Sequence, residues 1–260
     1  MDLQHLLASY DREQRIEIEY PGVRKEVCPH VVRFVRPAPG MNFILYSHLD
    51  ETNVDAVIQE QIDYFSQMEQ PWSWQVYDHD RPLDLKDRLM AHGFEPEDDP
   101  DAVMVLDLQA APRALLEPVT ADVRRIFQRD QLDDAVRVEE RVLGGEFGWL
   151  KQRLGDHLEV PDYLSVYAAY VEGQPACTGW VYFHPNSQFA SLFGGATVPD
   201  YRRRGLYTAV LAVRVQAAIS RGYRFLTVGA SPMSRPIVAR HGFRLLSYAC
   251  AYVWKENPGL

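Results

Sequence analysis

A basic, glycine-containing turn between a strand-like and a helix-like segment is the feature that most constrains this 260-residue chain. The turn reads Val198-Pro-Asp-Tyr-Arg-Arg-Arg-Gly-Leu-Tyr207, after the strand-like segment 189–198 and before the helix-like segment 206–220. The first N–H groups of a helix have no acceptor within the helix, and the helix dipole favours negative charge there. Gly205 has no Cβ, so an anion can approach the backbone closely. The turn therefore predicts a site for a phosphate-bearing ligand.

The turn matches neither of the two commonest nucleotide-binding loops, since G-x-x-x-x-G-K-[ST] and G-x-G-x-x-G are both absent. A strand, then Arg-x-x-Gly, then a helix resembles the acyl-CoA site of the GNAT superfamily of N-acetyltransferases. The motif of that superfamily is Gln/Arg-x-x-Gly-x-Gly/Ala, and Arg202, Gly205 and Tyr207 take its three defined positions. Tyr207 departs from the motif. Its side chain can point away from the ligand while its backbone N–H still donates to the phosphate. The competing interpretation is an altered site that binds no coenzyme A.

The resemblance implies which residues would hold acetyl-CoA as acyl donor. Thr197 and Val198 would offer backbone groups to the pantetheine arm, and a backbone N–H near Val198 would stabilise the oxyanion. Backbone N–H groups of residues 203–208 would hold the pyrophosphate, and the arginine side chains would reach the other phosphate. The expected cofactor-binding residues are Thr197, Val198, Arg202, Arg203, Arg204, Gly205, Leu206, Tyr207 and Thr208. The alternative for the arginines is a solvated basic turn.

The charges of the chain are unevenly distributed. Residues 1–112 hold 9 Lys and Arg against 22 Asp and Glu, whereas residues 113–260 hold 18 against 14. The acidic half has no evident use for nucleic acid, because that binding depends on neutralising phosphates. A mildly basic half suits a polyanionic small ligand such as coenzyme A. We therefore expect a small-molecule or peptide amine as acceptor and no nucleic-acid partner, while the oligomeric state stays open.

The sequence also carries few signs of a membrane, a secretory pathway or a metal. No apolar run approaches the roughly 20 residues that span a bilayer, and the first residues lack a basic stretch followed by an apolar core. Cys28, Cys177 and Cys250 are scattered and show no metal-ligand spacing. We expect a cytoplasmic protein with buried thiols, no metal and no membrane partner.

The order of the expected elements in the second half supports the resemblance. It is the order of the superfamily and predicts an α+β fold, with a mixed central sheet flanked by helices. We expect strands at 123–127, 163–171, 176–184, 189–198, 224–228 and 245–254, and helices at 131–142, 147–154, 206–220 and 235–240.

The first half repeats part of this order. Strands are expected at 31–35, 41–47, 74–77 and 102–108, and helices at 1–13, 50–68 and 83–92. The segments 89–94 and 238–243 both end a helix with His-Gly-Phe, although glycine C-capping and chance can produce the same match. The first half has no Arg-x-x-Gly-x-Gly before its long helix. We therefore predict two modules in tandem: residues 1–112, degenerate and unable to hold the cofactor, and residues 113–260, which bind acyl-CoA.

Direct attack on a thioester needs a general base for the amine. Glu146 lies in Gly144-Gly-Glu-Phe-Gly148, between the first two helices of the second half, where the superfamily borders its acceptor site. The alternative for Glu146 is a surface carboxylate. Glu139 and Glu140 lie in the middle of a helix and are expected to face water. His184, at a strand end, can also serve, although isolated histidines are usually structural.

The usual acid of the superfamily is missing. A tyrosine four residues before the glycine of Gly-Phe often protonates the leaving thiolate, and in this chain that position is Val238. Ser231 or Ser234 can approach the cofactor sulfur, but Ser234 is better explained as the N-cap of the helix at 235–240. The sequence thus predicts an acetyl-CoA-dependent N-acetyltransferase acting on a primary amine. The alternative is a catalytically silent ligand-sensing or interaction module of the same fold.

Overall fold

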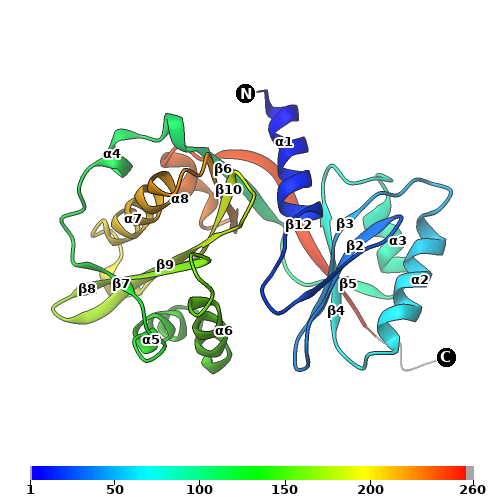
Figure 1. Ribbon diagram of the computed structural model, residues 1–260, viewed down its shortest axis with the longest axis horizontal. Helices are drawn as coiled ribbons and strands as arrows, with labels where there is room; N and C mark the ends of the chain where they lie inside the picture. Colours follow the sequence, from blue (N-terminus) through cyan, green and yellow to red (C-terminus); the bar gives the residue numbers. More distant parts are fainter. Residues whose placement is uncertain (1, 256–260) are drawn as a thin grey trace. The chain divides into compact units, whose positions relative to one another are not determined.

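The computed structural model describes residues 2–255, and these residues form two compact units (Figure 1). The first unit contains the described residues up to Val103, then Ala230–Arg235, and then the described residues from Leu245 onward. The second unit contains Met104–Gly229 and Pro236–Arg244. The last part of the chain therefore packs with the first.

The first unit is a sheet with helices α2 and α3 packed against it. Its strand order is β1-β2-β3-β4-β12, with β5 paired to β12; β3 and β4 are parallel and the other pairs antiparallel. Its core joins apolar residues of α2 and α3 to Ile44, Trp72 and Trp74 of the sheet. The elements are α1 (Leu3–Asp11), a π-helical turn (Arg12–Ile16), β1 (Arg24–Val27), β2 (Val31–Val35), β3 (Asn42–Ser47), α2 (Val54–Ser66), β4 (Trp72–Tyr77), α3 (Leu85–Ala91), β5 (Phe94–Pro96) and β12 (Arg244–Trp254).

The second unit is built on a sheet of order β6-β11-β10-β9-β8-β7. Strands β10 and β11 are parallel, and the pairs β10–β9, β9–β8 and β8–β7 are antiparallel. Its elements are β6 (Asp101–Asp107), α4 (Arg113–Leu116), β7 (Val123–Ile126), α5 (Leu132–Leu143), α6 (Gly148–Leu158), β8 (Leu164–Val171), β9 (Gln174–Phe183), β10 (Phe189–Thr197), α7 (Leu206–Ser220), β11 (Phe225–Ala230) and α8 (Arg235–Arg240).

Helices cover both faces of the second sheet. Figure 1 shows α5 and α6 on one face and α7 on the other. Helix α7 packs against β8, β9 and β10, and α5 packs against β9 and β10. The inward side of α5 repeats at i, i+3 and i+4, with Leu132, Ala135 and Val136 all buried. Strands β9 and β10 are therefore held between α5 and α7.

Each unit is completed by a strand from the other half of the sequence. Strand β12, at the end of the chain, pairs with β4 of the first unit from Ala249↔Tyr77 to Val253↔Ser73. Strand β6, from the first half, lies beside β11, and most of it belongs to the second unit. The predicted division at residues 112 and 113 stays a prediction about the two modules. The compact units do not follow one cut through the chain.

Most expected elements form where the sequence places them. Helices α7 and α8 have the expected bounds. Gly93 and Gly242 end α3 and α8 with φ of +89° each, so both glycines take the left-handed conformation expected of a C-terminal glycine. Strand β1, with the sequence Arg-Lys-Glu-Val, was not expected because it has no apolar alternation; it forms as the antiparallel partner of β2.

Candidate functional site

The basic turn joins β10 to α7 through two residues in the left-handed conformation. Arg203 has φ of +62°, and Gly205 has φ of +78° and stands at the N-cap of α7. No atom lies within 4 Å of the position that a Cβ on Gly205 would take. Glycine is therefore favoured at this position by the backbone conformation, and the space in front of it is open to a ligand.

The N-terminus of α7 presents unpaired backbone donors. The first hydrogen bond of the helix runs from the Ala209 N–H to the Gly205 carbonyl, at 3.0 Å. Among the described residues, the N–H groups of 205–208 have no hydrogen-bond partner. Arg203 and Arg204 are exposed beside them, and Arg202 donates from Nε to the Thr197 carbonyl at 3.1 Å. This combination of unpaired N–H donors and positive charge suits a pyrophosphate.

Strand β10 loses its partner β11 before the turn, and its pairing with β9 is interrupted and then resumes at Ala196. Its parallel pairing with β11 runs from Phe189↔Phe225 to Leu192↔Val228 and ends there. On the other side, its register with β9 shifts between Phe193 and Ala196. We call the two residues within this shift, Gly194 and Gly195, the bulge. Gly194 has φ of +60°, and the backbone edge that faces β11 has no ladder partner at the bulge.

The α7 side of the bulge is held by a buried arginine. Arg214 is 1 % exposed and donates to the carbonyls of Val210, Trp180 and Phe193, at 3.1 to 3.4 Å. A Cβ on Gly179 would lie 2.8 Å from the guanidinium, so glycine at this position makes room for it. Burial lowers the pKa of the Arg214 guanidinium, although arginine stays protonated in proteins. A fixed positive charge therefore lies beneath the bulge.

Tyr207 also packs on this side of the bulge. A Cβ on Gly195 would lie 2.9 Å from the Tyr207 ring, so the tyrosine does not point away from the sheet. Burial raises the pKa of the Tyr207 hydroxyl, and the positive charge of Arg214 opposes the rise. The departure from the superfamily motif thus places a ring under the bulge, while the Tyr207 N–H remains at the N-terminus of α7.

The Val198 backbone is engaged within the chain. Its N–H donates to the Ala176 carbonyl at 2.9 Å, and its carbonyl accepts from the Tyr201 N–H at 2.9 Å. The Val198 N–H is therefore not free to stabilise an oxyanion, so the expected backbone donor near Val198 is not the N–H of Val198 itself. The unpaired edge of β10 lies a few residues earlier, at the bulge.

Glu139 on α5 is buried, contrary to the expectation that it faces water. It is 4 % exposed, and its Oε1 has no hydrogen-bond partner among the described residues. Burial raises the pKa of its carboxyl to about 7. A signal in the sequence could have revealed its position: Glu139 continues the spacing of Leu132, Ala135 and Val136, which is the apolar side of the helix.

The other candidate acids and bases have ordinary surroundings. Glu146 is exposed in the loop between α5 and α6, and Glu140 accepts from the Phe147 N–H at 3.2 Å. Val238, at the position of the usual acid, is 1 % exposed. The hydroxyls of Ser231 and Ser234 lie 3.2 Å apart, just before α8.

Two histidines of the second unit have local partners. His184 is buried, with Nε2 3.1 Å from the Ser191 hydroxyl, and burial lowers the pKa of its ring to about 4. The Nε2 atom of His241 lies 3.3 Å from the Thr208 hydroxyl. Burial also lowers the pKa of the His241 ring, and His184 is not a base poised near neutral pH.

No three His, Cys, Asp or Glu side chains among residues 2–255 are grouped to hold a metal ion. Burial raises the pKa of the Cys177 thiol to about 11, so it stays protonated at neutral pH. Within the same part of the chain, no helix is long and apolar enough to cross a membrane.

The matching turn of the first unit carries a carboxylate. Between β3 and α2, the Asp50 carboxylate accepts from the N–H groups of Thr52 and Asn53 at 2.8 and 3.1 Å, and from the Thr52 hydroxyl at 2.6 Å. These hydrogen bonds lower the pKa of Asp50. An internal anion therefore stands just before α2, where the second unit leaves its donors free.

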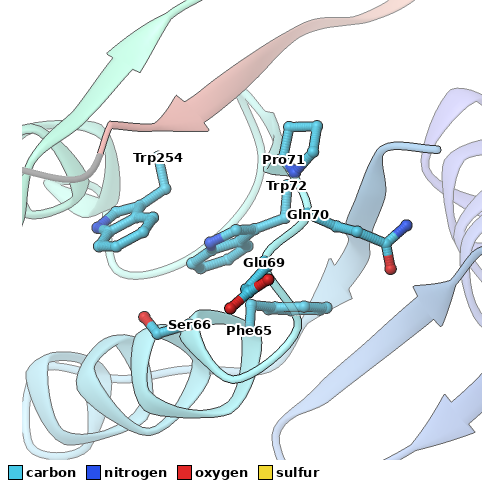
Figure 2. A pocket seen from close by; sticks show the side chains of 7 residues that line it. All are labelled: Phe65, Ser66, Glu69, Gln70, Pro71, Trp72 and Trp254. Carbon is cyan, nitrogen blue, oxygen red and sulfur yellow. The ribbon is translucent and has the colours of Figure 1, made fainter. Parts of the chain in front are cut away.

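A pocket of about 370 Å³ lies in the first unit, between the end of α2 and the start of β4 (Figure 2). Phe65, Trp72 and Trp254 supply its aromatic rings, with Glu69 beside them. Phe65 and Trp72 are each 1 % exposed and stack with ring centroids 4.5 Å apart. Trp72 and Trp74 are both core residues.

Comparison with known proteins finds likeness in structure alone. No protein-family model matches the sequence, and no curated protein sequence matches it. A GCN5-related N-acetyltransferase from Kribbella flavida has a TM-score of 0.69 at 13% identity, over 97% of this chain and 95% of that chain. A tandem GNAT protein from the clavulanic acid biosynthesis pathway has a TM-score of 0.63 at 13% identity, over 94% and 87%.

An acetyltransferase from the GNAT family of Colwellia psychrerythraea aligns over a similar extent. Its TM-score is 0.56 at 14% identity, covering 97% of this chain and 95% of that chain. These likenesses extend over both halves of the sequence. The chain therefore has the GNAT fold, an α+β arrangement of helices around a mixed sheet, as its sequence predicts.

Proposed function

We propose that this protein is an N-acetyltransferase that uses acetyl-CoA as acyl donor, and that the donor binds in the second unit. The observation that carries the proposal is the junction of β10 and α7. There, the unpaired N–H groups of residues 205–208, the exposed arginines and the open space before Gly205 form one anion site. The partnerless edge of β10 continues from this site and suits an extended, hydrogen-bonding pantetheine arm.

The transfer needs no nucleophilic side chain. The acceptor is a primary amine that attacks the thioester carbonyl directly, so the protein supplies proximity, an oxyanion donor and a proton acceptor. The unpaired backbone at the bulge replaces Val198 as our candidate for the oxyanion donor. We assign donor binding to the second unit alone, because Asp50 already fills the anion position of the first.

Calorimetric titration with acetyl-CoA tests the donor site. We expect the parent to bind and Gly205→Glu to lose binding, because a carboxylate would stand where the pyrophosphate does. Gly222→Glu is the matched control: Gly222 follows the other end of α7, has φ of +81° and has the same open space. No binding by the parent, or equal loss in both variants, would overturn the assignment.

A silent module of the same fold is the second candidate. The observation that favours it is the buried Val238 at the position of the usual acid. Release of free thiol from acetyl-CoA, measured with a panel of amino acids, polyamines, amino sugars and peptides, separates the two. Turnover with any of these amines supports the enzyme, and tight binding without turnover across the panel supports the silent module.

A further inference from the structure

Glu139 lies on α5, which covers the face of the sheet opposite α7 and its Arg214 (Figure 1). Helix α5 packs against β9 and β10, and the neighbours of Glu139 on α5 lie on either side of the bulge. Ala135 belongs to the core cluster that contains Trp180, the residue paired with Phe193. Val138 belongs to the cluster that contains Ala196. Glu139, next to Val138 and one turn after Ala135, therefore lies on the part of α5 that packs near the region between Phe193 and Ala196.

The carboxyl of Glu139 is buried without the partners that buried charges usually have. Its Oε1 has no hydrogen bond within the described residues, and no ion pair there involves it. An unpaired polar group in an apolar core destabilises the fold. Other carboxylates of α5 are engaged at the surface: Asp134 accepts from the Tyr170 hydroxyl, and Asp133 pairs with Lys151. A carboxyl that stays buried and unpaired near the bulge, although this lowers the stability of the fold, is a candidate catalytic group.

An exposed aromatic side chain lies on the same face of the sheet. Phe193, just before the bulge, is 51 % exposed, and its ring meets Tyr182 edge-on with ring centroids 5.5 Å apart. Tyr182 belongs to the core beneath α5 and α6, so Phe193 lies on their side of the sheet. An amine that carries apolar groups can pack on Phe193 while its nitrogen reaches the bulge.

We infer that Glu139 is the general base for the acceptor amine, which reaches the bulge from the face that α5 covers. The inference rests on the proposed acetyl transfer. It replaces Glu146, the base expected from the sequence, because Glu146 is an exposed loop residue. A buried carboxyl whose pKa is about 7 is partly ionised at neutral pH and is then a stronger base than an ordinary glutamate.

The proton and electron transfers balance as follows. Glu139 takes one proton from the substrate ammonium group, and the freed lone pair of nitrogen attacks the thioester carbonyl carbon. The new C–N bond forms, the C–S bond breaks, and the sulfur leaves with the bonding pair. The second proton lost by nitrogen passes to the sulfur, which gives the free thiol. Glu139 then returns its proton to solvent.

The test compares Glu139→Gln with two control variants, Glu140→Gln and Glu146→Gln. Each is titrated with acetyl-CoA and assayed for thiol release over a pH series, using the amine that supports the fastest turnover. We expect Glu139→Gln to bind acetyl-CoA like the parent but to lose turnover by about 100-fold or more. Its kcat should also lose the rise centred near pH 7 that the parent shows. Both controls should keep that rise.

The outcomes separate this inference from the proposed function. Failure of the parent to bind acetyl-CoA or to release thiol overturns both. If Glu139→Gln keeps the turnover and the pH profile of the parent, the inference about Glu139 is wrong and acetyl transfer is unaffected. If Glu146→Gln loses turnover instead, Glu146 is the base. A smaller loss for Glu139→Gln with an amine that is already neutral at the assay pH supports the role as base, because that acceptor has no ammonium proton to lose.

Discussion

The guanidinium of Arg214 occupies the space that a side chain on residue 179 would need. A Cβ built on Gly179 lies 2.8 Å from the guanidinium carbon, and the same guanidinium donates to the Phe193 carbonyl at 3.3 Å. The absence of a side chain on β9 therefore lets a residue of α7 hold the backbone of β10 at the point where its pairing with β9 shifts.

We expect Gly179→Ala to destabilise the protein by roughly 1–3 kcal/mol, because the methyl group forces the buried guanidinium to move. Displacing Arg214 also leaves the Trp180 and Phe193 carbonyls without this donor. Chemical denaturation of the parent and the variant measures the change. Gly148→Ala is the control, since a Cβ there meets no atom within 4 Å; equal stability of the two variants would contradict the steric argument.

Glu139→Gln should be more stable than the parent at neutral pH. The pKa of Glu139 is raised from 4.5 to about 7 on folding, so the folded state holds its proton more tightly than the unfolded state. The stabilisation that the protonated carboxyl of Glu139 gives the folded state is fully present below pH 4.5 and is lost as the pH rises through 7. The difference in unfolding free energy between variant and parent should therefore grow by about 3 kcal/mol over this range. Urea denaturation at several pH values measures it, and a difference independent of pH would contradict the buried titration.

His184 should make the protein less stable as the pH falls into the acid range. Burial lowers its pKa from 6.5 to about 4, so the unfolded state binds a proton more readily. Stability is full above pH 6.5 and falls as the pH drops toward 4, by about 3 kcal/mol for this group. His184→Asn keeps a polar side chain near Ser191 but does not titrate. The slope of its stability against pH should be shallower than that of the parent, whatever its absolute stability, and parallel slopes would exclude the effect.

Neither half of the chain should fold alone. Residues 1–112 lack β12, which pairs with β4 and β5, and residues 113–260 lack β6, which lies beside β11. We expect each fragment to lack a cooperative unfolding transition, and the two co-expressed fragments to recover one. Circular dichroism during thermal unfolding measures this. A sharp transition in either isolated fragment would show that the exchanged strand is dispensable.

The predictability of the fold and of the site differs for a physical reason. The bounds of α7 could be predicted because a glycine, an apolar run and a closing Gly222 all act locally. The burial of Glu139 depends on which side of α5 meets β10. The helical spacing indicates that side, but a glutamate is normally expected to face water. The partners of β12 could not be predicted, because a strand does not encode which edge of which sheet it joins.

Because each unit needs a strand from the other half of the sequence, the order in which the chain is synthesised affects its folding. Strand β4 is synthesised early, but β12, which covers its edge, follows about 170 residues later. At the usual pace of translation, the edge of β4 waits on the order of 10 s for its partner. An uncovered strand edge is a template for pairing with other chains. The growing chain therefore carries an uncovered edge on β4 until β12 has left the ribosome.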